Sequence, residues 1–427
     1  MMRWIVFIII YVIIDFYAFQ AIKTLTKKRW IHYLHVAISF IVVGNFIYQF
    51  MQVSAGRVLT PEKSYAFGFL LTLLALKIVV VPILFGEDIF RFISGFYNKL
   101  FSSSNNFFLP TRRKFVSQIA LAVAAIPFTS LLYGMYNGRY NFKVLKYSLE
   151  FDDLPDAFDG YQITQISDIH SGSFDNAEKI EYGVDLINQQ KSDILLFTGD
   201  IVNNKADEMD QWMDTFKKLE AKEGKYSILG NHDYGDYVDW ETEEAKEKNL
   251  DKLKEIHKEL GFDLLLNENR ILEKNSDKIA LIGVENWGTG GFKKVGDLNK
   301  ASADIGEKDF KILMSHDPSH WENEVKSHQT HYHLTLSGHT HGMQFGIEIP
   351  GWVKWSPAKW RYKYWAGIYE EDGQYINGWV GRFFWINLQI SGYRFVATSK
   401  TRFNSPLWYT HCKYYRMFYH RPSVWFI

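Results

Sequence analysis

The amino-acid sequence predicts a membrane region of four transmembrane helices followed by an α/β domain. Three observations support this division. Residues 1–137 hold four long apolar segments, whereas residues 138–378 alternate short apolar runs with helical patterns. Five of the short runs end at side chains that bind metals. The 427-residue chain has a formal net charge of zero, so its composition indicates no nucleic-acid partner.

Each of the four apolar segments approaches the ~20 residues that span a bilayer. They cover Trp4 to Ile22, Tyr33 to Met51, Ala66 to Phe85 and Phe115 to Tyr133. The alternative is a soluble bundle, but soluble helices show a polar face that these segments lack. Asp15 and Lys77 lie within the first and third segments, where they can pair with each other. A salt bridge inside the bundle is favoured there over a transport pathway.

Basic residues predict the orientation of the membrane region. The first and third connecting loops are rich in Lys and Arg, while the second holds only Arg57 and Lys63. Because positively charged loops stay in the cytoplasm, we expect a multi-pass cell-membrane protein whose second domain is extracytoplasmic. Arg112-Arg113 ahead of the fourth segment resembles a twin-arginine export signal. An ordinary basic flank of a membrane helix is an equal alternative.

The pattern of residues 138–378 predicts the elements of the α/β domain in turn. Strands are expected at Phe142 to Phe151, Gln162 to Ser167, Asp193 to Thr198, Tyr226 to Leu229, Ile279 to Val284, Phe310 to Met314 and His333 to Leu336. Helices are expected at Ala177 to Gln190, Met209 to Leu219 and Asp239 to Leu260. Strands that alternate with helices are typical of an α/β fold.

Eight candidate metal ligands follow five of these strands. They are Asp168, His170, Asp200, Asn231, His232, His316, His339 and His341. Ligands in open α/β sheets lie beyond the carboxyl ends of the strands, so we expect one shared site. The Asp-x-His and His-x-His spacings place both side chains on one side of an extended segment. Asn203 lies near the second motif, but it is assigned to a solvated loop.

The chemistry of these side chains predicts the kind of metal centre. Mixed carboxylate, imidazole and amide ligands suit Mn, Fe, Zn or Ni better than Mg or Ca. Eight candidates are too many for one tetrahedral ion, and they suit two divalent ions that share a bridging carboxylate. Such a centre clamps an in-line displacement at phosphorus.

The motifs, in this order, resemble those of the calcineurin-like metallophosphoesterase family. Leu154 to Phe158 ahead of Gln165 to His170 is similar to its membrane-anchored bacterial branch, and the resemblance covers about residues 140–378. It implies a β-sandwich flanked by helices. It also implies a hydrolase of phosphoester or pyrophosphate bonds that uses a metal-bound hydroxide. Anchoring in membrane lipid favours lipid-linked or envelope substrates over soluble ones.

The resemblance implies a role for each residue of the motifs. Asp168, His170 and His341 would hold one ion, Asn231, His316 and His339 the other, and Asp200 would bridge them. His232 would donate to the phosphate or protonate the leaving group, and Asp233 would orient His232.

Two rival functions belong to other classes of protein. One is a non-catalytic scaffold, which the intact ligand set disfavours; the other is a transporter or sensor with an attached domain, which only Asp15 and Lys77 support.

Residues 379–427 depart from the family pattern. They contain no Asp or Glu, seven Lys or Arg and fifteen aromatic residues. This tail is either a membrane-surface segment, which basic and aromatic residues suit, or an altered reading frame, which is favoured. In either case we expect it to contribute little to the core of the domain.

Overall fold

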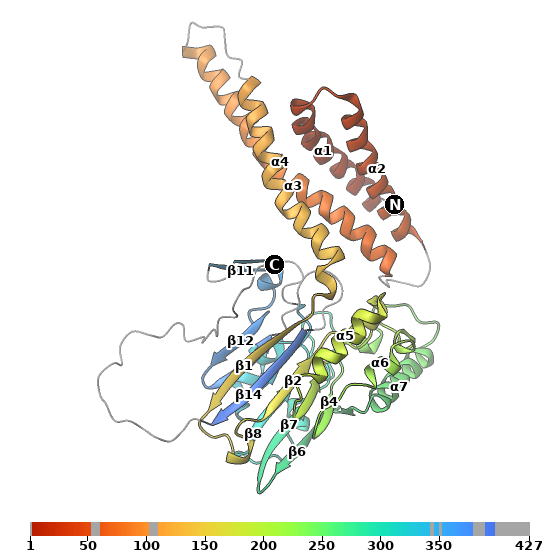
Figure 1. Ribbon diagram of the computed structural model, residues 1–427, viewed down its shortest axis with the longest axis vertical. Helices are drawn as coiled ribbons and strands as arrows, with labels where there is room; N and C mark the ends of the chain where they lie inside the picture. Colours follow the sequence, from red (N-terminus) through yellow and green to blue (C-terminus); the bar gives the residue numbers. More distant parts are fainter. Residues whose placement is uncertain are drawn as a thin grey trace, which may run out of the picture.

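The computed structural model describes residues 2–52, 60–101, 110–341, 346–349, 352–378 and 389–397. The chain forms four long helices and, below them in Figure 1, a domain built on β-sheets. The helices are α1 (Met2–Leu25), α2 (Arg29–Met51), α3 (Pro61–Phe101) and α4 (Pro110–Tyr136). All four are long and apolar enough to cross a membrane, which confirms the four predicted transmembrane helices.

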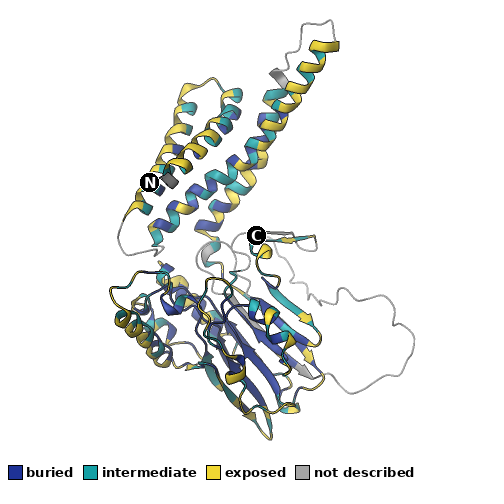
Figure 2. Cartoon of the chain, turned by 180° about the vertical axis from the view of Figure 1, so that it is seen from behind, coloured by how far each residue is buried: buried dark blue, intermediate teal, exposed yellow. Residues whose placement is uncertain are grey.

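Much of the outside of these helices is exposed (Figure 2), and many of the exposed residues are large and hydrophobic. Ile13, Phe40 and Ile78 are exposed large hydrophobic residues, one from each of α1, α2 and α3. An apolar surface of this extent marks an interaction with lipid or with another protein. Since the helices also have the length of membrane spans, lipid is the environment that fits them.

Asp15 and Lys77 form the ion pair that the sequence allowed. The Nζ atom of Lys77 lies 2.8 Å from Oδ1 of Asp15, and the Lys77 side chain is 1% exposed. Ser39 of α2 donates its hydroxyl to the same carboxylate oxygen at 2.9 Å. The pair therefore joins three helices through a satisfied polar cluster, which is how charges are tolerated at membrane depth.

Helix α3 is much longer than the predicted span of residues 66–85. Its 41 residues would measure about 60 Å, roughly twice the hydrocarbon thickness of a bilayer. The prediction stopped where Glu87 and Asp88 interrupt the apolar run. Both carboxylates are paired, because a guanidinium nitrogen of Arg113 in α4 lies 2.6 Å from Glu87 and 2.7 Å from Asp88. Arg91 of α3 adds a second guanidinium 3.2 Å from Glu87, so the two carboxylates are balanced and α3 continues beyond them (Figure 1).

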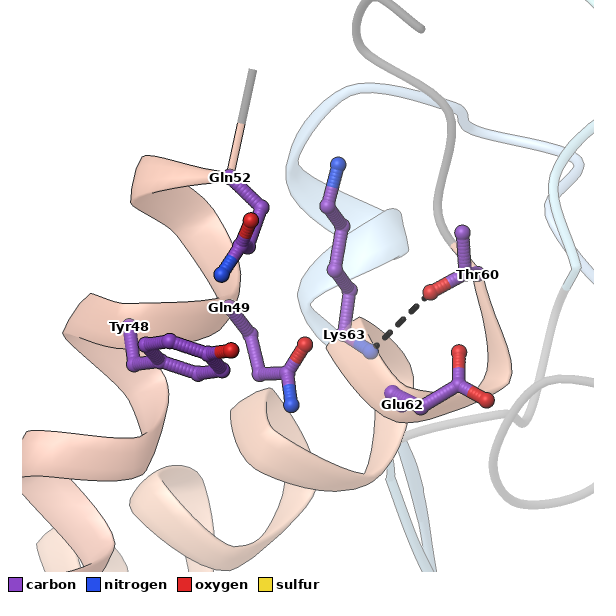
Figure 3. Close-up of a pocket in the computed structure, with 6 residues that line it drawn as sticks. All are labelled: Tyr48, Gln49, Gln52, Thr60, Glu62 and Lys63. Atoms are coloured by element: carbon purple, nitrogen blue, oxygen red, sulfur yellow. Dashed lines mark hydrogen bonds between the residues drawn. The ribbon is translucent and has the colours of Figure 1, made fainter. Parts of the chain in front are cut away.

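The opposite end of the bundle is marked by a polar pocket between the end of α2 and the start of α3. Its lining is Tyr48, Gln49, Gln52, Thr60, Glu62 and Lys63 (Figure 3). The backbone N–H of Lys63 donates to the hydroxyl of Thr60 at 3.4 Å. Amide and charged side chains of this kind suit the headgroup level of a membrane, so the pocket lies where the bundle meets water.

The second domain has two six-stranded sheets, ordered β1-β14-β2-β3-β4-β5 and β12-β13-β9-β8-β7-β6. The first sheet contains β1 (Lys143–Phe151), β2 (Gln162–Ile166), β3 (Ile194–Phe197), β4 (Gly224–Ser227), β5 (Asp263–Leu264) and β14 (Gln389–Ala397). The second contains β6 (Glu268–Lys274), β7 (Asp277–Gly283), β8 (Phe310–Met314), β9 (Leu334–Leu336), β12 (Gly367–Glu371) and β13 (Gln374–Gly378). A separate hairpin pairs β10 (Ile347–Ile349) with β11 (Val353–Trp355).

Apolar side chains from both sheets fill the space between them. Ile163 and Leu196 of the first sheet share a buried cluster with Leu281 and Ile312 of the second. Helices cover the outer faces: α5 (Ala177–Asn188), α6 (Met213–Phe216) and α7 (Glu243–Glu259) contribute to one cluster, α8 (Leu298–Ala301) and α9 (Ser319–Asn323) to another. Strands covered on both faces are buried along their whole length, as in the wholly apolar β3 and in β8, where Lys311 is the one charged residue. The expected sandwich flanked by helices is confirmed.

Strand β14 corrects the expectation that the chain beyond residue 378 contributes little to the core. It lies between β1 and β2, parallel to the former and antiparallel to the latter. Tyr393 and Phe395 are buried on one face of the strand, and Arg394 between them is exposed. The lack of acidic residues misled us because a buried strand needs none. The other residues of the tail, 379–388 and 398–427, lie outside the described residues, so the choice between its two interpretations stays a prediction.

Candidate metal centre

The eight predicted ligands come together at one edge of the sandwich. Asp168 and His170 follow β2, Asp200 follows β3, and Asn231 and His232 follow the stretch after β4; His316 follows β8, and His339 and His341 follow β9. Strands β2, β3 and β4 are parallel neighbours in one sheet, and β8 and β9 are parallel neighbours in the other. Their carboxyl ends therefore bring the ligands to one place, as predicted from the order of the motifs.

The backbone reaches this arrangement by sharp turns and not by an extended path. Asp168, His170, Asp200, His339 and His341 all have φ between 47° and 67°. This left-handed conformation is uncommon outside glycine and is maintained by the surrounding structure. Here the N–H of Asp168 donates to the Gly199 carbonyl at 2.9 Å, and that of His170 to the Asp200 carbonyl at 3.1 Å. The ligands converge as expected, but the geometric reason given for the Asp-x-His spacing is wrong.

One group of donor atoms comprises Asp168, His170, Asp200 and His341, whose ligand atoms all lie within 4.8 Å of one another. The Nε2 atoms of His170 and His341 are 3.1 Å apart. Oδ1 of Asp168 lies 3.3 Å from Nε2 of His341, and Oδ2 of Asp200 lies 3.7 Å from Nε2 of His170. This is the set expected for the first ion, together with the expected bridging carboxylate.

A second group shares Asp200 with the first. Its Oδ2 atom lies 3.1 Å from Nε2 of His316. The His316 ring lies 5.3 Å from the ring of His339, whose Nδ1 atom is 2.6 Å from Oδ1 of Asn231. Among the described residues, Oδ2 of Asp200 and Nε2 of His316 are buried and make no hydrogen bond of good geometry beyond their approach to each other. Because buried polar atoms need well-placed partners, a divalent ion held by both atoms fits this place.

Each of three histidine rings is held by the nitrogen that points away from the donor cluster. Nδ1 of His170 lies 3.2 Å from the Val202 carbonyl, and Nδ1 of His316 lies 2.7 Å from the Thr198 carbonyl. For His339 the partner is the hydroxyl of Tyr362, 2.8 Å from Nε2. Such contacts fix the tautomer and the ring orientation of metal-binding histidines. Tyr362 had no signal in the sequence.

Burial and charge divide the histidines into two kinds. Burial lowers the pKa of His170 and His341, and it lowers that of His339 to about 4, so these rings are neutral and able to bind a metal. Burial also opposes a charge on His316, but the Asp200 carboxylate outweighs it and raises the pKa of His316 to about 10. Without a metal, a proton on His316 therefore balances the charge of Asp200.

His232 lies at the border of the cluster. Its ring meets the ring of His170 edge to face, with centroids 4.8 Å apart. Its Nδ1 lies 2.7 Å from the carbonyl of Asn203, and its backbone N–H donates to Oδ1 of Asp200 at 2.8 Å. The backbone of Asn203, previously assigned to a solvated loop, thus orients the proposed catalytic histidine.

Asp233 does not make the predicted contact with His232. In the described part of the chain its carboxylate accepts three backbone N–H groups, from Asp200 at 2.8 Å, Ile201 at 2.9 Å and Gly230 at 2.8 Å. Burial and the nearby Asp200 raise the pKa of Asp233 to about 7. Its role is to tie the loop after β3 to the loop after β4, so it positions ligands and does not orient His232.

Two glycines permit the close approach of these loops. A Cβ atom at Gly230 would lie 2.3 Å from Oδ1 of Asp200, and one at Gly338 would lie 2.6 Å from Oδ2 of Asp168. Both contacts are far below van der Waals distance. The glycines that precede the Asn-His-Asp and His-x-His motifs are thus required by the packing of the ligands.

Comparison with known proteins gives two family matches. Residues 2–139 match the model of a probable calcineurin-like phosphoesterase transmembrane domain, and residues 161–343 match the calcineurin-like phosphoesterase model. Two relatives are the uncharacterized metallophosphoesterases YkuE and YkoQ of Bacillus subtilis. YkuE is 27% identical over 62% of this chain and 88% of its own length, and YkoQ is 26% identical over 53% and 77%. A transmembrane protein with metallophosphoesterase domain from Danio rerio is 25% identical over 53% of this chain and 51% of its own.

Proposed function

From the premise that the chain belongs to the calcineurin-like phosphoesterase family and carries its transmembrane domain, we propose a function for it. It is a membrane-anchored hydrolase of phosphoester or pyrophosphate bonds with a dinuclear metal centre. One observation carries the proposal. The same oxygen of Asp200 lies 3.7 Å from a ligand atom of the first group and 3.1 Å from one of the second. A carboxylate between two sets of donor atoms is the arrangement that two ions require.

Asp168, His170 and His341 would hold one ion, and Asn231, His316 and His339 the other. The donor set of imidazoles, carboxylates and one amide suits Mn, Fe, Zn or Ni. When bound, the two ions would acidify a water molecule and stabilise negative charge on the phosphoryl oxygens.

The protein's own contribution to bond cleavage centres on His232. The Asn203 carbonyl accepts from Nδ1, so Nε2 is the nitrogen left to exchange a proton with the substrate. A proton carried by Nε2 would pass to the oxygen of the leaving group, which is general acid catalysis. Asp233 acts at a distance by holding Asp200 and Gly230 in register.

The rival functions have less support. A non-catalytic scaffold has no need of left-handed backbone at five ligand positions. A transporter would use Asp15 and Lys77, but these two residues satisfy each other. For the location of the domain, the loop between α1 and α2 carries Lys27 and Lys28, so we propose that α4 leads out of the cytoplasm.

The test uses the full chain purified in detergent and stripped of metal. Hydrolysis of bis(p-nitrophenyl) phosphate is measured after addition of Mn, Zn, Ni or Mg, and bound metal is counted by elemental analysis. We expect two ions per chain and activity that depends on them. His328→Ala is the control and should retain both, because His328 is a half-buried histidine of the domain that is hydrogen-bonded to Asn299. Activity that persists in Asp200→Asn would show that the turnover belongs to another site.

A further inference from the structure

An aromatic and basic segment, Trp352 to Tyr362, follows the ligand loop after β9. It comprises β11 and the short helical turn Pro357–Trp360. Trp352 is 80% exposed and Trp360 is 77% exposed. Among the described residues of the domain from residue 138 onward, only Tyr182 and Ile271 are other exposed large hydrophobic side chains, at 50% and 40%. The domain thus gathers its most exposed apolar surface in one segment.

The segment lies at the end of the domain where the chain leaves the membrane helices. Trp365 and Ala366, just after it, pack with Leu145 of β1. Helix α4 ends at Tyr136, only nine residues before Leu145. In both views the hairpin that contains β11 lies at the end of the domain nearest the helices (Figures 1 and 2). The exposed tryptophans are therefore close to the surface in which the chain is anchored.

The charge of the segment suits a membrane surface. Residues 352–362 contain three Lys or Arg and no Asp or Glu. Lys359 is exposed beside Trp360, whose ring contacts that of Trp355 at a centroid distance of 5.5 Å. Tryptophan prefers the interface between headgroups and acyl chains, and basic residues are attracted to anionic lipids. Neither preference describes a surface that simply faces water.

The segment also reaches the metal centre. The hydroxyl of Tyr362 lies 2.8 Å from Nε2 of the proposed ligand His339. The ring of Phe292 meets the His339 ring edge to face at 4.8 Å, and the guanidinium carbon of the exposed Arg361 lies 4.9 Å from the Phe292 ring. The cation of Arg361, next to Trp360 in the sequence, is thus separated from the ligand histidine by one ring, where it would meet a phosphate entering from the membrane side.

We propose that Trp352 to Tyr362 is a docking surface for an anionic membrane, in which Trp352 and Trp360 enter the headgroup layer and hold the metal centre against it. The occupant is the bilayer that surrounds α1 to α4. The substrate class that follows, phosphoesters of membrane lipid headgroups, rests on the proposed function. The docking itself does not depend on that function.

The test locates single side chains of the full protein in nanodiscs that contain phosphatidylglycerol. In a Cys412→Ser background, a nitroxide label is attached at Trp352→Cys or Trp360→Cys. Tyr182→Cys and Ile271→Cys, the other exposed hydrophobic positions of the domain, are the matched controls. Electron paramagnetic resonance then compares collisions with oxygen, which enriches in lipid, and with a water-soluble nickel chelate. We expect oxygen to dominate at positions 352 and 360 and nickel to dominate at both controls.

Two outcomes would overturn the docking. Nickel dominance at 352 and 360 would place the segment in water. Low collision rates with both reagents would mean that protein covers it, either a second copy of the chain or its own residues after 397. The readout needs no turnover, so an inactive protein whose labels lie in lipid refutes the proposed function and supports the docking.

The substrate class has its own measurement. The double variant Trp352→Ser with Trp360→Ser should lose at least tenfold more turnover on phosphatidylglycerol or phosphatidic acid in nanodiscs than on bis(p-nitrophenyl) phosphate. The double variant Tyr182→Ser with Ile271→Ser should show no such difference. Equal losses on both kinds of substrate, or no hydrolysis of either lipid by an enzyme that cleaves the soluble diester, would refute lipid headgroups as substrates.

Discussion

Asp233→Asn tests whether Asp233 ties two ligand loops together or orients His232. Oδ2 of Asp233 accepts two backbone N–H groups and Oδ1 accepts one. If the asparagine oxygen replaces Oδ2, its NH2 group must face the N–H of Ile201, so one hydrogen bond is lost and two buried donors oppose each other. A lost bond to a charged acceptor with an unsatisfied donor costs about 2–4 kcal/mol. For a domain of this size that corresponds to a melting temperature roughly 5–10 °C lower.

The assay is thermal unfolding of the full chain in detergent, with metal content measured on the same sample. We expect both the melting temperature and the metal content to fall, because Asp200 and Gly230 are no longer held in register. Asp236→Asn is the control, since Asp236 is partly exposed and its ion pair with Lys246 contributes at most about 1 kcal/mol. If Asp233→Asn kept its stability and metal while losing turnover as His232→Ala does, the loop-tying role would be wrong.

Three further predictions concern the site, the core and the membrane region. Asp200→Asn should weaken both metal sites, whereas His232→Ala should keep its metal by elemental analysis and lose kcat roughly 10²–10⁴-fold on the soluble diester. Burial lowers the pKa of His257 to about 3, below its usual 6.5. The neutral ring therefore contributes its full stability above pH 6.5, and this contribution is lost as pH falls toward 3. His257→Leu should remove about 2 kcal/mol of the decrease in unfolding free energy between pH 8 and pH 5, measured by unfolding titrations. A reporter active only in the cytoplasm, fused after residue 150, should be silent, and activity of this fusion would contradict the placement. It should stay silent in the double variant Arg112→Lys with Arg113→Lys, because Arg113 forms ion pairs with Glu87 and Asp88.

The ligands were predictable because their position follows from strand ends alone. Asp200 comes three residues after the end of the apolar strand β3, and His316 comes two residues after the end of β8. The carboxyl ends of neighbouring parallel strands must meet. What each side chain contacts was not predictable. Asp233 stands beside His232 in the sequence, but the short helical turn that begins at His232 directs its carboxylate back to the loop after β3. Adjacency in sequence says little about contact once the backbone leaves an extended path.

The two errors of extent have a common cause in long-range pairing. Glu87 and Asp88 mark the end of the apolar run, but Arg113, twenty-six and twenty-five residues away, pairs with both of them. Tyr393 and Phe395 read as part of an atypical tail until β1 and β2 provide edges on both sides. Each element is stabilised by a partner that no local window contains, so composition alone placed its boundary too early.

The carboxylate of Asp200 carries a charge that the fold must balance in every state. It is buried, its Oδ1 is used by the N–H of His232, and its Oδ2 faces His316 and His170. Without metal, the proton on His316 supplies the positive charge, which is why the Asp200 carboxylate raises the pKa of that histidine. A divalent ion would take the place of that proton, so metal binding and proton release at His316 are linked. The loops after β3 and β4, which Asp233 ties together, therefore arrange the site for a cation before any cation binds.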